Sequence, residues 1–287
     1  MKKPSLIQKN AASHWVGDGF PVRSIFSYND IASEMSPFLL LDYAGPTNFP
    51  ATKNKLGVGE HPHRGFETVT IVYEGEVEHR DSSGGGGTIT SGDVQWMTAG
   101  AGIVHEEFHG TAYAKHGGPF EMVQLWVNLP KKDKSTPAAY QGITNAQIPR
   151  IALPDDAGFV RVIAGQYNGN KGPARTFSEM NVWDVRMNAA HRAEFQVVAG
   201  HTSSIFVLKG RIRLPSGESV GEAELVVLER EGATLSFEAE ENATLLFLNG
   251  KPIDEPIVGY GPFVMNTEAE IRQAFVDYRS GRMGKLS

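Results

Sequence analysis

The stretch Gly59-Glu60-His61-Pro62-His63-Arg64-Gly65-Phe66-Glu67 places two histidines two residues apart between glycines. In a β-strand, residues i and i+2 project from the same face, so His61 and His63 can direct two imidazole rings toward one point. A lone His-x-His pair in a strand is more commonly a surface feature or a hydrogen-bonded core histidine than a metal site. The pair therefore needs partners elsewhere in the chain to indicate a metal centre.

The segment Gly102-Ile103-Val104-His105-Glu106-Glu107 supplies candidates for these partners. His105 and Glu107 have the same spacing and so share one face of a strand. Two such pairs would provide three imidazole nitrogens and one carboxylate, a suitable ligand set for a first-row divalent metal. A closed tetrahedral zinc site with a structural role is the alternative. A chain of 287 residues can build its cores without a metal, which favours a site with an open coordination position.

Short segments with strand character recur roughly every eight to twelve residues along the chain, a spacing typical of a β-sandwich or barrel. Glycine accounts for 32 of the 287 residues, about 11% against a usual value of about 7%, and many of the glycines lie between these segments. The sequence therefore predicts an all-β fold. The candidate strands are residues 23–28, 38–44, 67–73, 76–80, 93–97, 103–108, 122–129, 159–164, 181–187, 194–198, 204–209, 224–229, 234–237 and 244–248.

The chain divides into two parts around residues 131–158, where prolines and charged residues interrupt the periodicity and predict a linker. On each side a strand ends in a charged residue and a glycine, Glu74-Gly75 and Lys209-Gly210. This weak repeat of about 135 residues indicates two similar β domains. We therefore expect an N-terminal domain over 1–130 and a C-terminal domain over 159–287.

A single helix is predicted at residues 267–280. Thr267 and Glu270 form a capping-box pattern, and Gly281 is placed to end the helix. Between them, apolar residues at i, i+3, i+4 and i+7 form one stripe: Ile271, Ala274, Phe275 and Tyr278. This stripe is expected to pack against a β domain.

The composition excludes several classes of function. With 27 basic and 33 acidic residues the formal charge is −6, which argues against a dedicated nucleic-acid or anionic-membrane binder. The absence of cysteine excludes disulfides, thiolate catalysis, iron–sulfur clusters and sulfur-ligated zinc. No apolar run approaches the roughly 18 residues of a membrane span, and no secretory leader is recognisable, so we expect a cytoplasmic protein.

The two histidine segments resemble the two motifs of the cupin superfamily, and longer phrases resemble the pirin family of bicupins. The most specific of these phrases are His61-Pro62-His63-Arg64-Gly65-Phe66-Glu67-Thr68-Val69 and Gly92-Asp93-Val94-Gln95-Trp96-Met97-Thr98-Ala99-Gly100. Further similar phrases begin near the N-terminus and end just before the predicted helix: residues 14–20, 40–45, 124–129 and 261–267. The resemblance thus covers almost the whole chain.

The resemblance implies two cupin barrels (double-stranded β-helix or jelly-roll) facing each other, with a short C-terminal helix and one metal site in the N-terminal barrel. The ligands that it implies are His61, His63, His105 and Glu107. Cupins in general use a glutamate of the first motif instead, which corresponds to Glu67 here. Because Glu67 has the same parity as the two histidines of its segment, it remains an alternative ligand or a partner of a ligand.

The same offsets predict that the C-terminal barrel holds no metal. His61 and His63 lie fourteen and twelve residues before Gly75, and the same offsets before Gly210 give Gln196 and Val198. Aligning Gly102 with Gly232 places Leu235 and Phe237 at the positions of His105 and Glu107. Three of these four side chains have no donor atom for a divalent ion. We therefore expect one divalent transition metal per chain. Fe²⁺ is the first candidate for this cofactor, and Ni, Mn, Cu, Co or Zn are the alternatives.

The resemblance implies a quercetin 2,3-dioxygenase-like oxidoreductase, which cleaves a flavonol or related enolic substrate with dioxygen. The metal would acidify the enolic hydroxyl, and Glu107, as catalytic base, or Glu67 would accept its proton. The alternatives are a non-catalytic metal-binding regulator that acts on a protein partner, and a metal-dependent hydrolase or isomerase. We expect a small aromatic or enolic substrate and dioxygen as partners of a monomeric protein, with no separate organic cofactor and no direct contact with nucleic acid or membrane.

Overall fold

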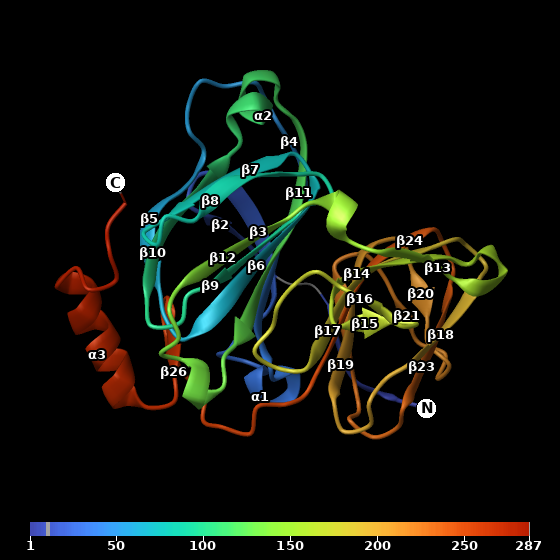
Figure 1. The fold of residues 1–287 in the computed structure, drawn as a ribbon. Coiled ribbons are helices and arrows are strands. Elements are labelled where there is room, and N and C mark those ends of the chain that lie inside the picture. Colours follow the sequence, from blue (N-terminus) through green and yellow to red (C-terminus); the bar gives the residue numbers. More distant parts are fainter. Residues whose placement is uncertain (10–11, 287) are drawn as a thin grey trace. The chain divides into compact units, whose positions relative to one another are not determined.

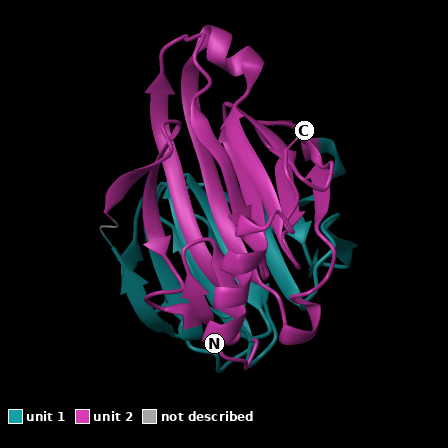
Figure 2. Cartoon of the chain, turned by 90° about the vertical axis from the view of Figure 1, so that its left-hand side faces the viewer, with its two compact units in different colours: residues 1–11, 33–37, 146–252 teal, residues 12–32, 38–145, 253–287 magenta. Residues whose placement is uncertain are grey.

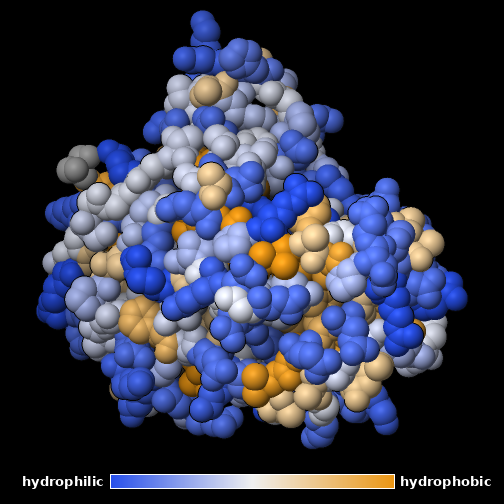
Figure 3. Space-filling model, turned by 45° about the vertical axis from the view of Figure 1, so that its right-hand side comes forward, coloured by the Kyte–Doolittle hydropathy of each residue, from blue (hydrophilic) through white to orange (hydrophobic). Residues whose placement is uncertain are grey.

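The computed structural model describes residues 1–9 and 12–286. Its chain forms two compact units, which Figure 2 distinguishes by colour. Residues 12–32, 38–145 and 253–287 form the unit that we call the N-terminal barrel, and residues 1–11, 33–37 and 146–252 form the C-terminal barrel. Hydrophilic residues predominate on the face drawn in Figure 3, with small groups of apolar residues between them. No helix among the described residues is long and apolar enough to cross a membrane.

The N-terminal barrel consists of two antiparallel sheets (Figure 1). The larger has the order β12-β9-β6-β11-β4-β3-β2, with β12 Ala139–Ile143, β9 Val94–Thr98, β6 Phe66–Glu74, β11 Gly118–Asn128, β4 Phe38–Phe49, β3 Phe20–Phe26 and β2 Ser13–Val16. The smaller has the order β5-β10-β7-β8, with β5 Gly57–His63, β10 Ile103–His109, β7 Glu76–Asp81 and β8 Gly86–Thr90. Apolar side chains of both sheets form one core between them, including Phe20, Val72, Val77, Ile89 and Phe120.

The C-terminal barrel repeats this arrangement strand for strand. Its larger sheet has the order β1-β22-β19-β24-β17-β14-β13, with β1 Pro4–Gln8, β22 Glu224–Leu228, β19 Thr202–Lys209, β24 Ala243–Gly250, β17 Met180–Met187, β14 Gly158–Ala164 and β13 Arg150–Ala152. Its smaller sheet has the order β18-β23-β20-β21, with β18 Arg192–Gln196, β23 Thr234–Ala239, β20 Ile212–Arg213 and β21 Ser219–Val220. The two strands of the predicted repeat, which end at Glu74 and Lys209, occupy corresponding places in the two large sheets.

Short elements complete the two units. They are the hairpins β15 Gln166–Tyr167 with β16 Asn170–Lys171 and β25 Val258–Tyr260 with β26 Phe263–Met265, the helices α1 Ala32–Met35, α2 Thr111–His116 and α3 Glu268–Arg279, and the 3-10 turns η1 Lys131–Asp133, η2 Asn145–Gln147 and η3 Pro154–Asp156. The predicted C-terminal helix is confirmed as α3. Its N-cap is Thr267, whose hydroxyl accepts a hydrogen bond from the Glu270 backbone N–H.

The assignment of this helix to the C-terminal domain is wrong, because α3 packs on the N-terminal barrel (Figure 1). The apolar stripe of the helix, with Ile271 and Ala274 buried, lies against Phe263, Met265 and the β10 residue Val104. At the other end of the chain, β1 pairs with β22 and so belongs to the C-terminal barrel. The division into 1–130 and 159–287 therefore does not describe the two units.

The segment 131–158 is not an unstructured linker. Its strand β12 extends the large sheet of the N-terminal barrel by pairing with β9, and β13 pairs with β14 at the edge of the other large sheet. Within this segment, the chain passes from one unit to the other between residues 145 and 146. Both strands are short and lie between prolines, which explains why their periodicity is too weak to detect in the sequence.

Candidate metal centre

The three predicted histidine ligands lie on the adjacent strands β5 and β10. His105 is the cross-strand partner of His61, and Ile103 is that of His63. The ring centroids are 4.2 Å apart for His61 and His105, 4.9 Å for His63 and His105, and 4.9 Å for His61 and His63. Each ring offers one nitrogen to a common cluster in which all three nitrogens lie within 4.8 Å of one another. The strand parity expected from the sequence is sufficient to bring the rings together.

The predicted carboxylate ligand, Glu107, lies beside this cluster but belongs to a second group, formed with His79 and His105. An irregularity in the pairing of β10 with β5 falls between His105 and Glu107, so the two side chains do not continue a regular ladder. On the other side of β10 the register is regular, and Glu107 faces His79 of β7. Sequence spacing suggests one set of four ligands, whereas the described residues form two overlapping groups of three.

Three polar side chains hold the Glu107 carboxylate. The Gln95 amide donates a hydrogen bond to Oε1, the Thr70 hydroxyl lies 3.4 Å from the same oxygen, and the Gln124 amide donates to Oε2 at 3.3 Å. Gln124 also accepts a hydrogen bond from Thr70 at 2.6 Å. These contacts fix the position of a carboxylate that is only 5% exposed.

The nitrogens of the cluster are suited to a metal ion. Burial lowers the pKa of both His63 and His105 well below the usual range, so both rings are neutral and each retains a lone pair. Nε2 of His105 is buried and has no hydrogen-bond partner within the described part of the chain. An unsatisfied buried nitrogen is costly unless it binds something else, and a divalent ion would satisfy it. The donor set of this site therefore fits a metal.

The outer nitrogens of these histidines are held by backbone carbonyls. Nδ1 of His61 lies 2.8 Å from the Gly59 carbonyl oxygen, and Nδ1 of His63 lies 3.3 Å from that of Pro262. A donated Nδ1–H bond of this kind fixes the tautomer that keeps the lone pair on Nε2. Pro262 belongs to the β25–β26 hairpin, so a segment close to the C-terminus contributes to the site.

His79 and its neighbours are the part of the site that the sequence did not reveal. The His79 Nε2 lies 3.0 Å from Asp81 Oδ2, its Nδ1 lies 3.3 Å from Nδ1 of His105, and its ring stacks on Tyr140 with centroids 5.0 Å apart. The available signal was the i, i+2 spacing of His79, in the predicted strand 76–80, and Asp81, directly after that strand. Tyr140 comes from β12, in the segment predicted to be a linker.

Glu67 lies apart from the histidines. Its Oε1 accepts a hydrogen bond from the Thr98 hydroxyl at 2.8 Å, and burial raises its pKa to about 7. Within the described residues it belongs to neither group that could hold a metal. Gly65, with a φ of 89°, separates β5 from β6 and breaks the parity that the sequence suggested between Glu67 and the histidines.

A cavity of about 320 Å³ opens onto the cluster, and His61, His63 and Glu107 line it. Most of its wall is apolar and comes from β2, β3, β5 and β11: Val16, Phe20, Val22, Val58, Met122 and Trp126. The polar groups that complete the lining are Asp42 and Gln124. A largely apolar cavity with a few convergent polar groups is the usual form of a small-molecule site.

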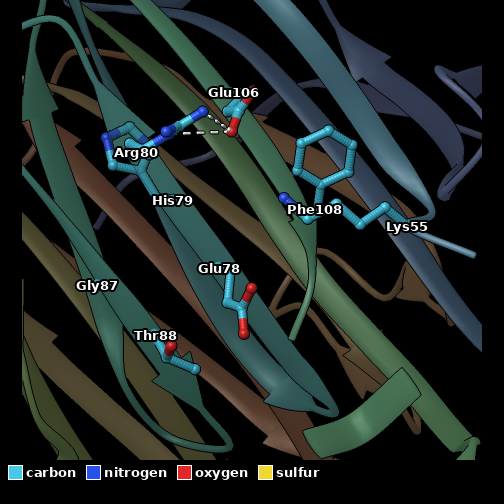
Figure 4. A pocket seen from close by; sticks show the side chains of 8 residues that line it. All are labelled: Lys55, Glu78, His79, Arg80, Gly87, Thr88, Glu106 and Phe108. Carbon is cyan, nitrogen blue, oxygen red and sulfur yellow. Dashed lines mark hydrogen bonds and ion pairs between the residues drawn. The ribbon is translucent and has the colours of Figure 1, made fainter. Parts of the chain in front are cut away.

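The outer surface of β7 and β10 carries a separate groove of about 380 Å³ (Figure 4). His79 borders it, but its other residues on β7 and β10 alternate with the metal-site residues, among them Glu78, Arg80 and Glu106. Arg80 and Glu106 form an ion pair of 2.9 Å across it. A surface ion pair of this kind is typical of the solvated face of a sheet.

The positions in the C-terminal barrel that were aligned with the ligands carry no ligand cluster. Leu235 and Phe237 are buried in the core of that barrel, whereas Gln196 and Val198 are exposed. Among the described residues, both groups of histidine and acidic side chains that could bind a metal lie in the N-terminal barrel.

Comparisons with known proteins agree with this architecture. The model of the pirin family matches residues 19–127, and that of the pirin C-terminal cupin domain matches residues 182–284. A Pseudomonas aeruginosa protein named "Putative quercetin 2,3-dioxygenase" is 55% identical over 282 residues, which cover 98% of each chain. The crystal structure of a quercetin 2,3-dioxygenase from Acinetobacter baumannii has a TM-score of 0.97 and 53% identity and covers both chains completely.

A more distant structure shares the fold. The bacterial pirin YhhW of Escherichia coli, solved in complex with nickel(II), has a TM-score of 0.67 and 19% identity over 86% of this chain and 99% of its own. Two strand-for-strand related barrels, one of them with a buried histidine cluster, define a bicupin. The chain belongs to the pirin family.

Proposed function

We propose that this protein is a metal-dependent dioxygenase of the quercetin 2,3-dioxygenase type. His61, His63, His105 and Glu107 would hold one divalent metal, with Fe²⁺ as the first candidate. The observation that carries the proposal is the buried His105 Nε2, which has no partner among the described residues and lies in a three-histidine cluster beside an apolar cavity. The names of the Pseudomonas and Acinetobacter relatives support the assignment of the reaction.

Glu107 is the residue that we assign to proton transfer. The bound metal would supply Lewis acidity for an enolic oxygen and the redox chemistry that dioxygen requires. Glu107 would accept the enolic proton, because it is the acidic residue that lines the cavity together with His61 and His63 on the metal-binding strands. Gln95 and Gln124 would keep its two oxygens in place during this transfer.

The cavity selects the substrate by its apolar wall. Trp126 stacks on Phe66 with ring centroids 4.2 Å apart and meets the His63 ring edge-on at 5.2 Å. A flat aromatic molecule could lie against this wall while its enolic oxygen faces the histidines. One chain provides every residue of the proposed centre, so the proposal includes a monomer as the working unit. It also keeps the cytoplasmic location that was expected from the sequence.

Oxygen consumption tests this function directly. The iron-loaded protein is mixed with quercetin in an oxygen electrode, and the loss of quercetin absorbance is recorded with and without air. We expect both signals in air, neither without air, and neither with His63→Ala. Bound iron without oxygen uptake would contradict the enzyme and favour the alternative, a metal-binding regulatory protein. Turnover that persists without air would indicate hydrolase or isomerase chemistry.

A further inference from the structure

We propose that Asp42 binds a second hydroxyl group of the substrate, so that the cavity selects aromatic enols with additional hydroxyls over the unsubstituted compounds. This inference rests on the proposed function, because it takes an aromatic enol as the occupant of the cavity. It names a residue for substrate recognition that lies on neither strand of the histidine cluster.

The position of Asp42 brings it into the cavity that also contains the metal centre. Asp42 lies on β4 and is the cross-strand partner of Gln124 on β11 and of Ser24 on β3. Its side chain lines the cavity together with His61, His63 and Glu107. Because one continuous space joins these groups, a single molecule can contact the histidine cluster and Asp42 at the same time.

The Asp42 carboxylate has acceptor capacity that the protein leaves unused. The Ser24 hydroxyl donates to Oδ1 at 2.5 Å, and this is the one hydrogen bond to the carboxylate found among the described residues. No lysine or arginine forms an ion pair with Asp42 in that part of the chain. A carboxylate has about four lone-pair positions, so most of them remain available to a ligand.

The apolar surroundings of Asp42 make a carboxylate at this position costly for the stability of the fold. Apolar side chains such as Val16, Val22 and Met122 form the wall beside it. Burial raises the pKa of Asp42, while the Ser24 hydrogen bond and the nearby His14 oppose this rise. A half-buried carboxyl group without a cationic partner costs stability, and functional sites are where such groups concentrate.

A phenolic hydroxyl is the donor that best matches this site. The apolar wall and the rings of Phe20 and Trp126 favour an aromatic framework, and an aromatic hydroxyl presents its proton in the plane of the ring. A hydrogen bond to a charged acceptor in an apolar cavity is stronger than one between neutral groups. A ligand that lacks the hydroxyl leaves the carboxylate buried without its partner, and such losses give strong discrimination.

The test compares two probes that differ in hydroxyl groups. Quercetin and 3-hydroxyflavone share the flavonol core, but 3-hydroxyflavone carries only the enolic hydroxyl. Their dissociation constants are measured without oxygen on the metal-loaded protein by quenching of tryptophan fluorescence. The proteins are the wild type, Asp42→Asn, and Asp30→Asn as a control at an exposed carboxylate outside the cavity. Thermal unfolding verifies that each variant is folded.

We expect the wild type and Asp30→Asn to bind quercetin about 10-fold or more tightly than 3-hydroxyflavone. Asp42→Asn should lose most of this preference through weaker quercetin binding, with 3-hydroxyflavone changed by less than about 2-fold. If Asp42→Asn does not fold, Asp42→Ser, which also removes the carboxylate, must give the same pattern. Equal weakening of both probes, or unchanged discrimination, would overturn the assignment of Asp42. The discrimination is measured without turnover, so it stands even if oxygen uptake fails and the dioxygenase proposal falls.

Discussion

His79 and His105 face each other through their Nδ1 atoms, 3.3 Å apart, in the interior of the N-terminal barrel. Only one of these two nitrogens can carry the proton of a hydrogen bond between them. Burial raises the pKa of Asp81, but hydrogen bonds from His79 and Ser83 outweigh it and hold the pKa at about 2, so the carboxylate is an acceptor. His79 therefore donates from Nε2 to Asp81 and accepts at Nδ1 from His105. This leaves the lone pair of His105 on Nε2, the nitrogen without a partner.

Replacing His79 should weaken metal binding although His79 is outside the proposed ligand set. His79→Phe keeps an aromatic ring against Tyr140 but removes the acceptor for the His105 N–H. We expect the affinity for Ni²⁺ or Fe²⁺ to fall about 10- to 100-fold, as is usual when the partner of a ligating histidine is lost. Competition with a metallochromic chelator measures this affinity without any dependence on turnover.

His109→Phe is the matched control. His109 is another buried histidine of β10, and its Nε2 bonds to the Gly19 carbonyl at 2.8 Å, outside both metal-binding groups found among the described residues. Its replacement should leave the metal affinity within about 2-fold of the wild type. Equal losses in the two variants would show a general packing effect and would refute the role of His79 in orienting His105.

Removing a ligand should cost the metal but not the fold. His63→Ala takes one nitrogen from the cluster, whereas the cores of both barrels consist of apolar side chains that do not include it. We expect near-zero metal content and a cooperative thermal transition close to that of the metal-free wild type, measured by elemental analysis and circular dichroism. Loss of the transition would indicate a structural metal.

Glu67 should make stability fall as the pH rises. Its pKa is about 7 in the folded chain against an ordinary value of 4.5, so the folded state holds a proton that the unfolded state releases between these values. Stability is therefore greatest below about pH 4.5 for this group and declines until about pH 7. Glu67→Gln should lose less stability between about pH 5 and about pH 8, by roughly 1–3 kcal/mol. If the free energy of unfolding changed equally with pH in the two proteins, this prediction would be contradicted.

Lys134 should contribute strongly to the stability of the N-terminal barrel. It is 2% exposed, and its ammonium donates to the Gly65 and Val264 carbonyls and to Asn128 Oδ1 at 2.7–2.9 Å. Lys134→Met would leave these acceptors buried without a donor, at an expected cost of about 2–5 kcal/mol. The exposed Lys132→Met is the control, with an expected change within about 0.5 kcal/mol in chemical denaturation. Similar effects of both variants would refute this role.

The features that could be predicted from the sequence are those that depend on local spacing. The i, i+2 parity of His61 and His63 is a property of a single strand, and antiparallel pairing of β5 with β10 then brings the His105 ring beside them. The cap of α3 is equally local, since Thr267 and Glu270 are neighbours on one turn. The repeat of a strand that ends in a charged residue and a glycine is also local in sequence, and it marks corresponding strands of the two barrels.

The features that the sequence did not predict depend on contacts between distant segments. Gly65 lies where the chain passes from the small sheet to the large sheet, and this change of sheet separates Glu67 from the histidines although their spacing in the sequence suggested one face. The irregular pairing beside His105 separates Glu107 from the regular ladder. Tyr140 reaches His79 only because β12 adds to the edge of the large sheet. None of these contacts leaves a periodic signal in a single segment.

The most direct test of the proposed centre is the position of the metal in crystals of the iron-loaded protein, located by anomalous scattering at the iron edge. We predict one peak per chain, at roughly 2.0–2.3 Å from nitrogens of His61, His63 and His105 and from a carboxylate oxygen of Glu107. A peak bound by His79 in place of His61 and His63, or a second peak in the C-terminal barrel, would contradict the account.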